Sequence, residues 1–123
     1  IMANKRNLKK YMKTMAANLA GETLFILNYY ENIDEAKADA IIDKILALVT
    51  EKTNNVSVSF DKTCKVSFEG NRKDYRKAHA AYFKKCYNEL ADEFNNGVQA
   101  ILKEMNGLLS KEQLEENKRM ANA

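Results

Sequence analysis

The stretch that decides the fold is residues 72–106, RKDYRKAHAAYFKKCYNELADEFNNGVQAILKEMN. Apolar and aromatic side chains recur in it at steps of only three or four residues, at Tyr75, His79, Tyr82, Cys86, Leu90, Phe94, Val98, Ile101 and Met105. Because this spacing keeps them on one face of a helix with 3.6 residues per turn, it predicts one long amphipathic helix. Asn95-Asn96-Gly97 is typical of a turn, but the pattern crosses it in phase, which favours continuity over a break.

Three further helices are expected around this one. A helix over about residues 4–32 is indicated by an apolar stripe of Leu8, Met12, Met15, Leu19, Ile26 and Tyr30. After the capping signal Asn32-Ile33-Asp34-Glu35, a second stripe predicts a helix over about 34–53. Ser110-Lys111-Glu112-Gln113 has the form of a capping box and predicts a short helix over 111–119.

The segment 56–68 has a different period. Val56-Ser57-Val58-Ser59-Phe60 alternates strictly between apolar and polar residues, and Cys64-Lys65-Val66-Ser67-Phe68 alternates again after three intervening residues. Alternation of this kind is typical of half-buried strands, so the segment is predicted to be a small β-hairpin. The alternative is an irregular loop between helices.

These elements predict a mainly α-helical fold. Three long helices with short connections indicate an up-down-up three-helix bundle with a short C-terminal helix. A chain of 123 residues, 1–123, suits a single helical domain with one core. The absence of Pro and the presence of only four Gly agree with long uninterrupted helices.

The net charge of +3 conceals a block pattern along the chain. Residues 1–14 carry +5 with no acid, residues 15–61 carry −5, residues 62–86 carry +6 and residues 87–123 carry −3. Such asymmetry is more informative about partners than the total charge. The two basic blocks coincide with the starts of the first and third long helices.

The candidate binding residues belong to these two basic blocks. They are Lys5, Lys9 and Lys13 at the start of the first helix, and Arg72, Arg76 and Lys77 at the start of the third. Cations at a helix start oppose the helix dipole, and like charges four residues apart repel, so these residues do not stabilise their own helices. In an up-down-up bundle both starts are predicted to lie at one end and to concentrate positive potential there.

Several partners suit such an end. An acidic protein or a second copy of the chain in a homodimer is favoured over nucleic acid, and an ordinary solvated surface is the alternative to all of them. The sequence therefore predicts a non-catalytic protein-interaction or self-association module, with a nucleic-acid-binding protein as the second hypothesis.

Catalytic, cofactor and metal sites are not expected. The chain has one His and two Cys, without a C-x-x-C or Glu-x-x-His motif, and it lacks a Gly-rich phosphate loop. His79 and Cys86 share a helical face but lie roughly 10 Å apart along the axis, too far for a nucleophile and its base. An enzyme would require a pocket that joins Cys64, His79 and a carboxylate.

The composition also predicts where in the cell the protein is found. The longest apolar run, Leu24 to Leu27, is far shorter than a membrane span of about twenty residues. The basic N-terminus lacks the apolar region of a secretory signal. A cytoplasmic protein with reduced Cys64 and Cys86 is predicted.

The opening Met2-Ala3-Asn4-Lys5-Arg6-Asn7-Leu8-Lys9-Lys10, together with the spacing from Ala38 to Ile42, resembles small helical proteins of gut Bacteroidales. The resemblance covers about half of the chain and is weakest over residues 56–68. No activity is assigned to that family, so the resemblance implies a cytoplasmic helical protein and no functional residues.

Overall fold

The structure is a computed structural model that describes residues 5–56 and 68–121. These residues form four α-helices and no strand: α1 (Lys5–Tyr29), α2 (Glu35–Asn54), α4 (Arg72–Asn106) and α5 (Lys111–Ala121). The prediction of a mainly α-helical fold is confirmed, and the expected helix bounds differ from these by three residues at most. The predicted hairpin, apart from its end residues Val56 and Phe68, lies outside the described residues.

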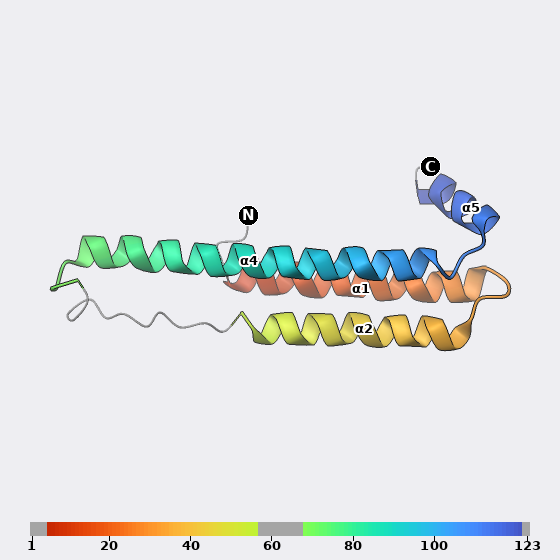
Figure 1. Ribbon diagram of the computed structural model, residues 1–123, viewed down its shortest axis with the longest axis horizontal. Helices are drawn as coiled ribbons and strands as arrows, with labels where there is room; N and C mark the ends of the chain where they lie inside the picture. The colour runs from red at the N-terminus through yellow and green to blue at the C-terminus, as the bar shows by residue number, and fades with distance from the viewer. Residues whose placement is uncertain (1–4, 57–67, 122–123) are drawn as a thin grey trace.

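Three of the helices pack side by side along one axis (Figure 1). α1 and α2 run in opposite directions and are joined by a short turn. α4 lies along both of them and runs in the same direction as α1, while α5 turns back from the far end of α4. Each pair among α1, α2 and α4 is in contact.

The helix starts are set by local hydrogen bonds that the sequence predicted. The Lys37 backbone N–H donates to the Asp34 side chain at 3.2 Å and starts α2. At the start of α5, the Ser110 N–H donates to Gln113 Oε1 at 2.9 Å, and the Gln113 N–H donates to Ser110 Oγ at 3.2 Å. This reciprocal pair is the predicted capping box.

The core lies between α1, α2 and α4 and consists of the predicted stripes. Its fully covered side chains include Leu8, Met12 and Ile26 of α1, Ile45 of α2, and Phe94 and Met105 of α4. The one buried polar side chain in the described ranges, Thr23, donates its hydroxyl to the Leu19 carbonyl at 2.9 Å. Burying this apolar surface at about 25 cal/mol per Å² is what holds the helices together.

Gly97, in the middle of the continuous helix α4, has a packing role. A Cβ atom at this position would lie 2.7 and 2.8 Å from the two terminal methyl groups of Leu48, so α2 crosses α4 closely at the glycine. The turn-like Asn95-Asn96-Gly97 therefore marks a helix crossing, with no break in the helix.

α4 extends well beyond the ends of its neighbours (Figure 1). The Tyr11 hydroxyl donates to the Asn95 side chain at 2.6 Å, and Lys5 precedes Tyr11 by six residues, so α1 begins near the level of Glu89. α2 ends two residues after Lys52, which pairs with Glu93 at 3.1 Å. All the buried residues of α4 lie between Tyr87 and Met105. We call residues 72–86, about 22 Å of helix, the α4 arm.

A candidate partner-binding surface

The start of α1 carries a stripe of basic side chains that line an open hollow. Lys5, Arg6, Lys9, Lys10 and Lys13, with Thr14, line a hollow of about 690 Å³. The predicted residues Lys5, Lys9 and Lys13 are therefore brought together, as their spacing along one helix requires. Arg6 and Lys10 belong to the same surface but were not among the predicted site residues. The sequence could have predicted them, because Arg6 and Lys10 belong to the same acid-free basic block, residues 1–14.

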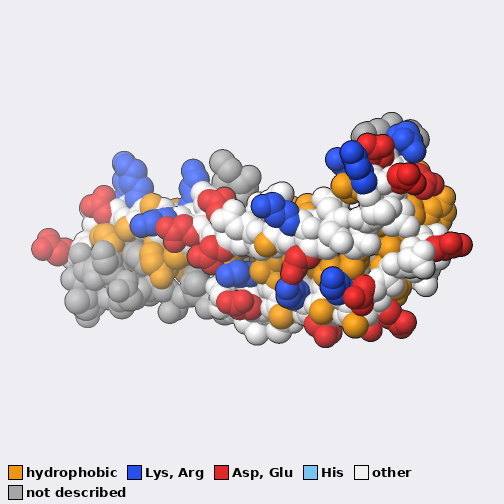
Figure 2. All heavy atoms as spheres, turned by 45° about the vertical axis from the view of Figure 1, so that its right-hand side comes forward, with side chains coloured by type: hydrophobic (Ala, Val, Ile, Leu, Met, Phe, Trp, Pro, Cys, Tyr) orange, Lys and Arg blue, Asp and Glu red, His pale blue; other side chains and the backbone are white. Residues whose placement is uncertain are grey.

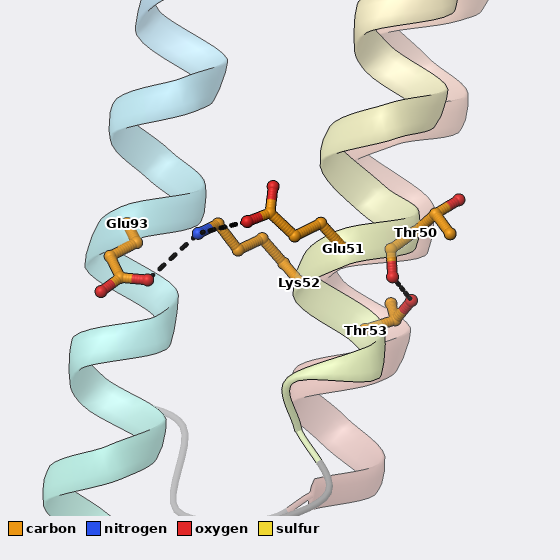
Figure 3. Close-up of polar contacts among 5 residues, drawn as sticks. All are labelled: Thr50, Glu51, Lys52, Thr53 and Glu93. Atoms are coloured by element: carbon orange, nitrogen blue, oxygen red, sulfur yellow. Dashed lines mark hydrogen bonds and ion pairs between the residues drawn. The ribbon is translucent and has the colours of Figure 1, made fainter.

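These lysines lack the ion pairs that lysines of the packed region have. No carboxylate of the described residues lies within ion-pair distance of Lys5, Lys9, Lys10 or Lys13. In contrast, Figure 3 shows Lys52 of α2 reaching Glu93 of α4 at 3.1 Å, with Glu51 on its other side at 3.9 Å. Among the described residues, the positive charge of these four lysines is therefore not compensated by a carboxylate.

The α4 arm is a second basic surface. Arg72, Lys73, Arg76, Lys77, Lys84 and Lys85 are all exposed on it. Figure 2 shows basic side chains projecting from this part of the molecule. Within the described ranges none of them pairs with a carboxylate, although Asp74 lies in the same helix. Lys73, Lys84 and Lys85 belong to the same basic block of the sequence, residues 62–86, but were not among the predicted site residues.

The prediction of a single shared basic end needs correction. The starts of α1 and α4 point the same way, but they are staggered by about 25 Å, because α1 begins near the level of Glu89 and α4 begins at Arg72. Lys5, Lys9 and Lys13 therefore form one surface, and Arg72, Arg76 and Lys77 form another further out. Sequence periodicity gives the direction of a helix in a bundle but not its axial offset.

Aromatic rings form a row along the α4 arm. Tyr75 and His79 have ring centroids 5.7 Å apart, His79 and Phe83 are 4.6 Å apart, and Phe83 and Tyr87 are 5.8 Å apart. The row has the i, i+4 spacing of neighbours on a helix surface. His79 thus lies between aromatic rings, and the half-buried Cys86 has a free thiol. Cys64, which an enzymatic pocket would have to bring to His79, lies outside the described residues.

The opposite end of the molecule is where α5 meets the end of α1. The Tyr29 hydroxyl donates to Glu116 and the Tyr30 hydroxyl donates to Asn117, both at 3.4 Å, and the Gln113 side chain donates to the Glu31 carbonyl at 3.1 Å. Burial, followed by the nearby Glu116 carboxylate, raises the pKa of Tyr30 above its ordinary value. α5 has no buried residue of its own, so polar contacts carry much of its attachment.

Two further features of the part of the chain that the structure describes concern metal binding and membrane spanning. The described residues contain no group of three or more His, Cys, Asp or Glu side chains that could hold a metal ion. Within the same ranges, no helix has the length and apolar content needed to cross a membrane.

Comparison with known proteins gives no match to a family model, to a curated protein or to a solved structure. The resemblance to Bacteroidales proteins therefore stays a prediction. The two basic surfaces and the aromatic row are the features that bear on function.

Proposed function

We propose that this protein is a non-catalytic protein-interaction module that uses the basic start of α1 to bind an acidic partner. The observation that supports this most directly is the set of four lysines there, Lys5, Lys9, Lys10 and Lys13, which have no ion pair with a described carboxylate. The proposal takes α1, α2 and α4 as an up-down-up bundle in one cytoplasmic domain.

An acidic partner would change the electrostatic energy of the α1 start. Repulsion between lysines four residues apart, and between each lysine and the helix dipole, costs a few tenths of a kcal/mol each. A partner carboxylate would remove this repulsion and add attraction of its own. Exposed charge pairs contribute little individually, so several must act together to give useful affinity.

A second copy of the chain is a candidate for the partner. Large apolar side chains remain exposed on α1 and α2, with Leu24 at 47%, Tyr29 at 53% and Leu46 at 54% of their full exposure. Exposed apolar residues of this size are typical of association surfaces when they are contiguous. Light scattering over a range of concentrations tests this, and a strict monomer at high concentration contradicts it.

The test of the basic surface compares two probes. Binding of a fluorescent polyglutamate peptide and of a generic duplex DNA is measured by anisotropy across a salt series. We expect polyglutamate to bind, with affinity that falls as salt rises, and Lys9→Gln/Lys13→Gln to weaken binding about tenfold.

The matched control is Lys118→Gln/Arg119→Gln, which removes two exposed cations from α5. It should change the affinity less than twofold. Equal losses in both double variants would mean that only total charge matters, which contradicts a defined surface. Preference for the DNA, with a steep salt slope blunted by the α1 variant, would support nucleic-acid binding instead.

A further inference from the structure

The face of α4 that meets α1 continues along the α4 arm, where α1 is absent. Asn95 marks this face, because its side chain accepts the hydrogen bond of Tyr11. Lys84 and Lys73 precede Asn95 by eleven and twenty-two residues, and Lys77 precedes Lys84 by seven. Eleven residues make about three helical turns and seven make about two, so these lysines lie on the same face as Asn95.

The same repeat continues the packing pattern of that face. Ala91 packs against the core, and Ala80, eleven residues earlier, is its exposed counterpart in the arm. Similarly, Val98 and Tyr87 are buried, and the next position back is the exposed Arg76. The arm thus has an exposed small residue at the position that corresponds to Ala91. Beside it are basic residues where the packed region has uncharged ones.

This arrangement forms a ledge that lies on the continuation of the α1 axis. Ala80 lies at its centre, and Tyr87 lies at the end nearest to α1. Its basic residues are Lys73, Arg76, Lys77 and Lys84. It ends at the start of α1, where Lys5 and Lys9 add further positive charge. The ledge has the length of the α4 arm, about 22 Å, which corresponds to about fifteen residues of helix.

We propose that this ledge binds an acidic amphipathic helix of a partner protein, which lies on the α1 axis and extends the helix packing along the α4 arm. The position of Ala80 selects a helix over nucleic acid. Ala80 is the exposed counterpart of Ala91, which packs against the core, so a helix on the α1 axis would continue the packing that α1 makes against α4. The basic residues beside Ala80 then select acidic side chains at the edge of the partner helix. This inference rests on the proposed function, since it assumes an acidic partner.

The experiment uses the full chain and a synthetic peptide of about fifteen residues, with leucines on one helical face and glutamates flanking them. A peptide of the same composition in scrambled order is the reference. We expect the amphipathic peptide to bind at least about tenfold more tightly than the scrambled one. Lys77→Glu/Lys84→Glu should weaken its binding by about tenfold or more. Circular dichroism confirms that each variant is folded.

Two matched controls separate the ledge from general charge and from general damage. Lys85→Glu is compared with the single variant Lys84→Glu, which changes the net charge by the same amount. Lys85 shares its face with Asp74 and Asp92, so Lys85→Glu should weaken binding less than twofold and less than Lys84→Glu. Ala80→Trp fills the ledge without changing charge and should abolish binding of the amphipathic peptide while polyglutamate binding stays. Ala81→Trp, one position away and also exposed, should leave both unchanged.

Each contrary result has a distinct meaning. Equal binding of the two peptides, or no effect of Ala80→Trp, would overturn the ledge while the proposed function survives through Lys9 and Lys13. Tighter binding of duplex DNA than of the amphipathic peptide, lost in Lys77→Glu/Lys84→Glu, would overturn it in favour of nucleic acid. If no acidic probe binds at low salt, both the ledge and the proposed function are wrong.

Discussion

The two halves of α4 share one helix and one periodicity but have different surroundings. From Tyr87 to Met105 the stripe of α4 is buried against α1 and α2, and its lysine neighbours across the interface pair with Glu93 and Glu104. In the arm, residues 72–86, no residue is fully buried, and the cations have no partner among the described carboxylates. Periodicity alone therefore predicts a helix, while burial depends on what lies beside it.

The difference also separates stability from binding. The packed half holds the fold together, so substitutions there are expected to change the free energy of unfolding. The arm contributes fewer buried contacts, so substitutions there are expected to change local opening and partner binding instead. Three comparisons between the packed region and the arm test this division, and a pair of glycine substitutions tests the crossing of α2 and α4. They follow from the largest expected effect to the smallest.

The largest effect is expected for Phe94→Ala. Phe94 is fully buried and packs edge-to-face on Tyr11, with ring centroids 5.9 Å apart, so its truncation should lower the free energy of unfolding by about 3–5 kcal/mol. Phe83→Ala in the arm removes a half-buried ring and should cost less than half as much. Urea unfolding followed by circular dichroism measures both. Equal losses would show that the arm packs as tightly as the rest of α4.

Two glycine substitutions should have opposite signs. A Cβ atom added at Gly21 would meet nothing within 4 Å, so Gly21→Ala should stabilise the protein by about 0.5–1 kcal/mol through helix propensity. Gly97→Ala gains the same propensity but forces Leu48 to move, and should destabilise by about 1 kcal/mol.

Thermal and urea unfolding of the single variants and of Leu48→Ala/Gly97→Ala complete this test. With Leu48 truncated, the alanine at position 97 should become neutral or stabilising. If Gly97→Ala is stabilising in the parent chain, the close approach of α2 and α4 is wrong.

The N-caps of α2 and α4 are expected to differ in their contribution to global stability. Asp34→Ala removes the cap of α2, a helix packed along its length, and should cost about 1 kcal/mol of global stability. Asn71 caps the arm by accepting the Asp74 N–H at 3.2 Å. Its replacement by Ala should leave global unfolding almost unchanged and speed amide hydrogen exchange in the first turns of α4. A global loss as large as that of Asp34→Ala would mean that the arm unfolds together with the core.

The smallest effects are expected for the lysines. Lys52 is only 14% exposed at its side chain and bridges α2 to α4, so Lys52→Gln should cost about 0.5 kcal/mol, and less at high salt. Lys77→Gln relieves repulsion within the arm and should be neutral or stabilising by a few tenths of a kcal/mol. Urea unfolding at low and at high salt separates the two, and loss of stability in Lys77→Gln would contradict the absence of a paired carboxylate.

Much of the local structure was predictable because it depends on nearest neighbours. The cap at Asp34 and the reciprocal pair of Ser110 and Gln113 involve residues three apart in the chain, and both are present. The candidate lysines of α1 are likewise brought together by helical spacing alone. The turn-like signal at Gly97 was correctly outweighed by phase, although its packing role could not be read without Leu48.

The sequence did not predict the axial offset between the packed helices. The basic starts were expected at one end of the bundle. Tyr11 contacts Asn95 and Lys52 contacts Glu93, however, which places the α4 arm beyond both neighbouring helices. The sequence by itself determined the helices, their caps and their apolar faces, since these follow from spacing and local hydrogen bonds. Only the tertiary structure decided the axial stagger of the helices, and with it the α4 arm. The reason is that axial register depends on side-chain fit between residues far apart in the chain. Tyr11 and Asn95 are 84 positions apart, and Lys52 and Glu93 are 41 positions apart.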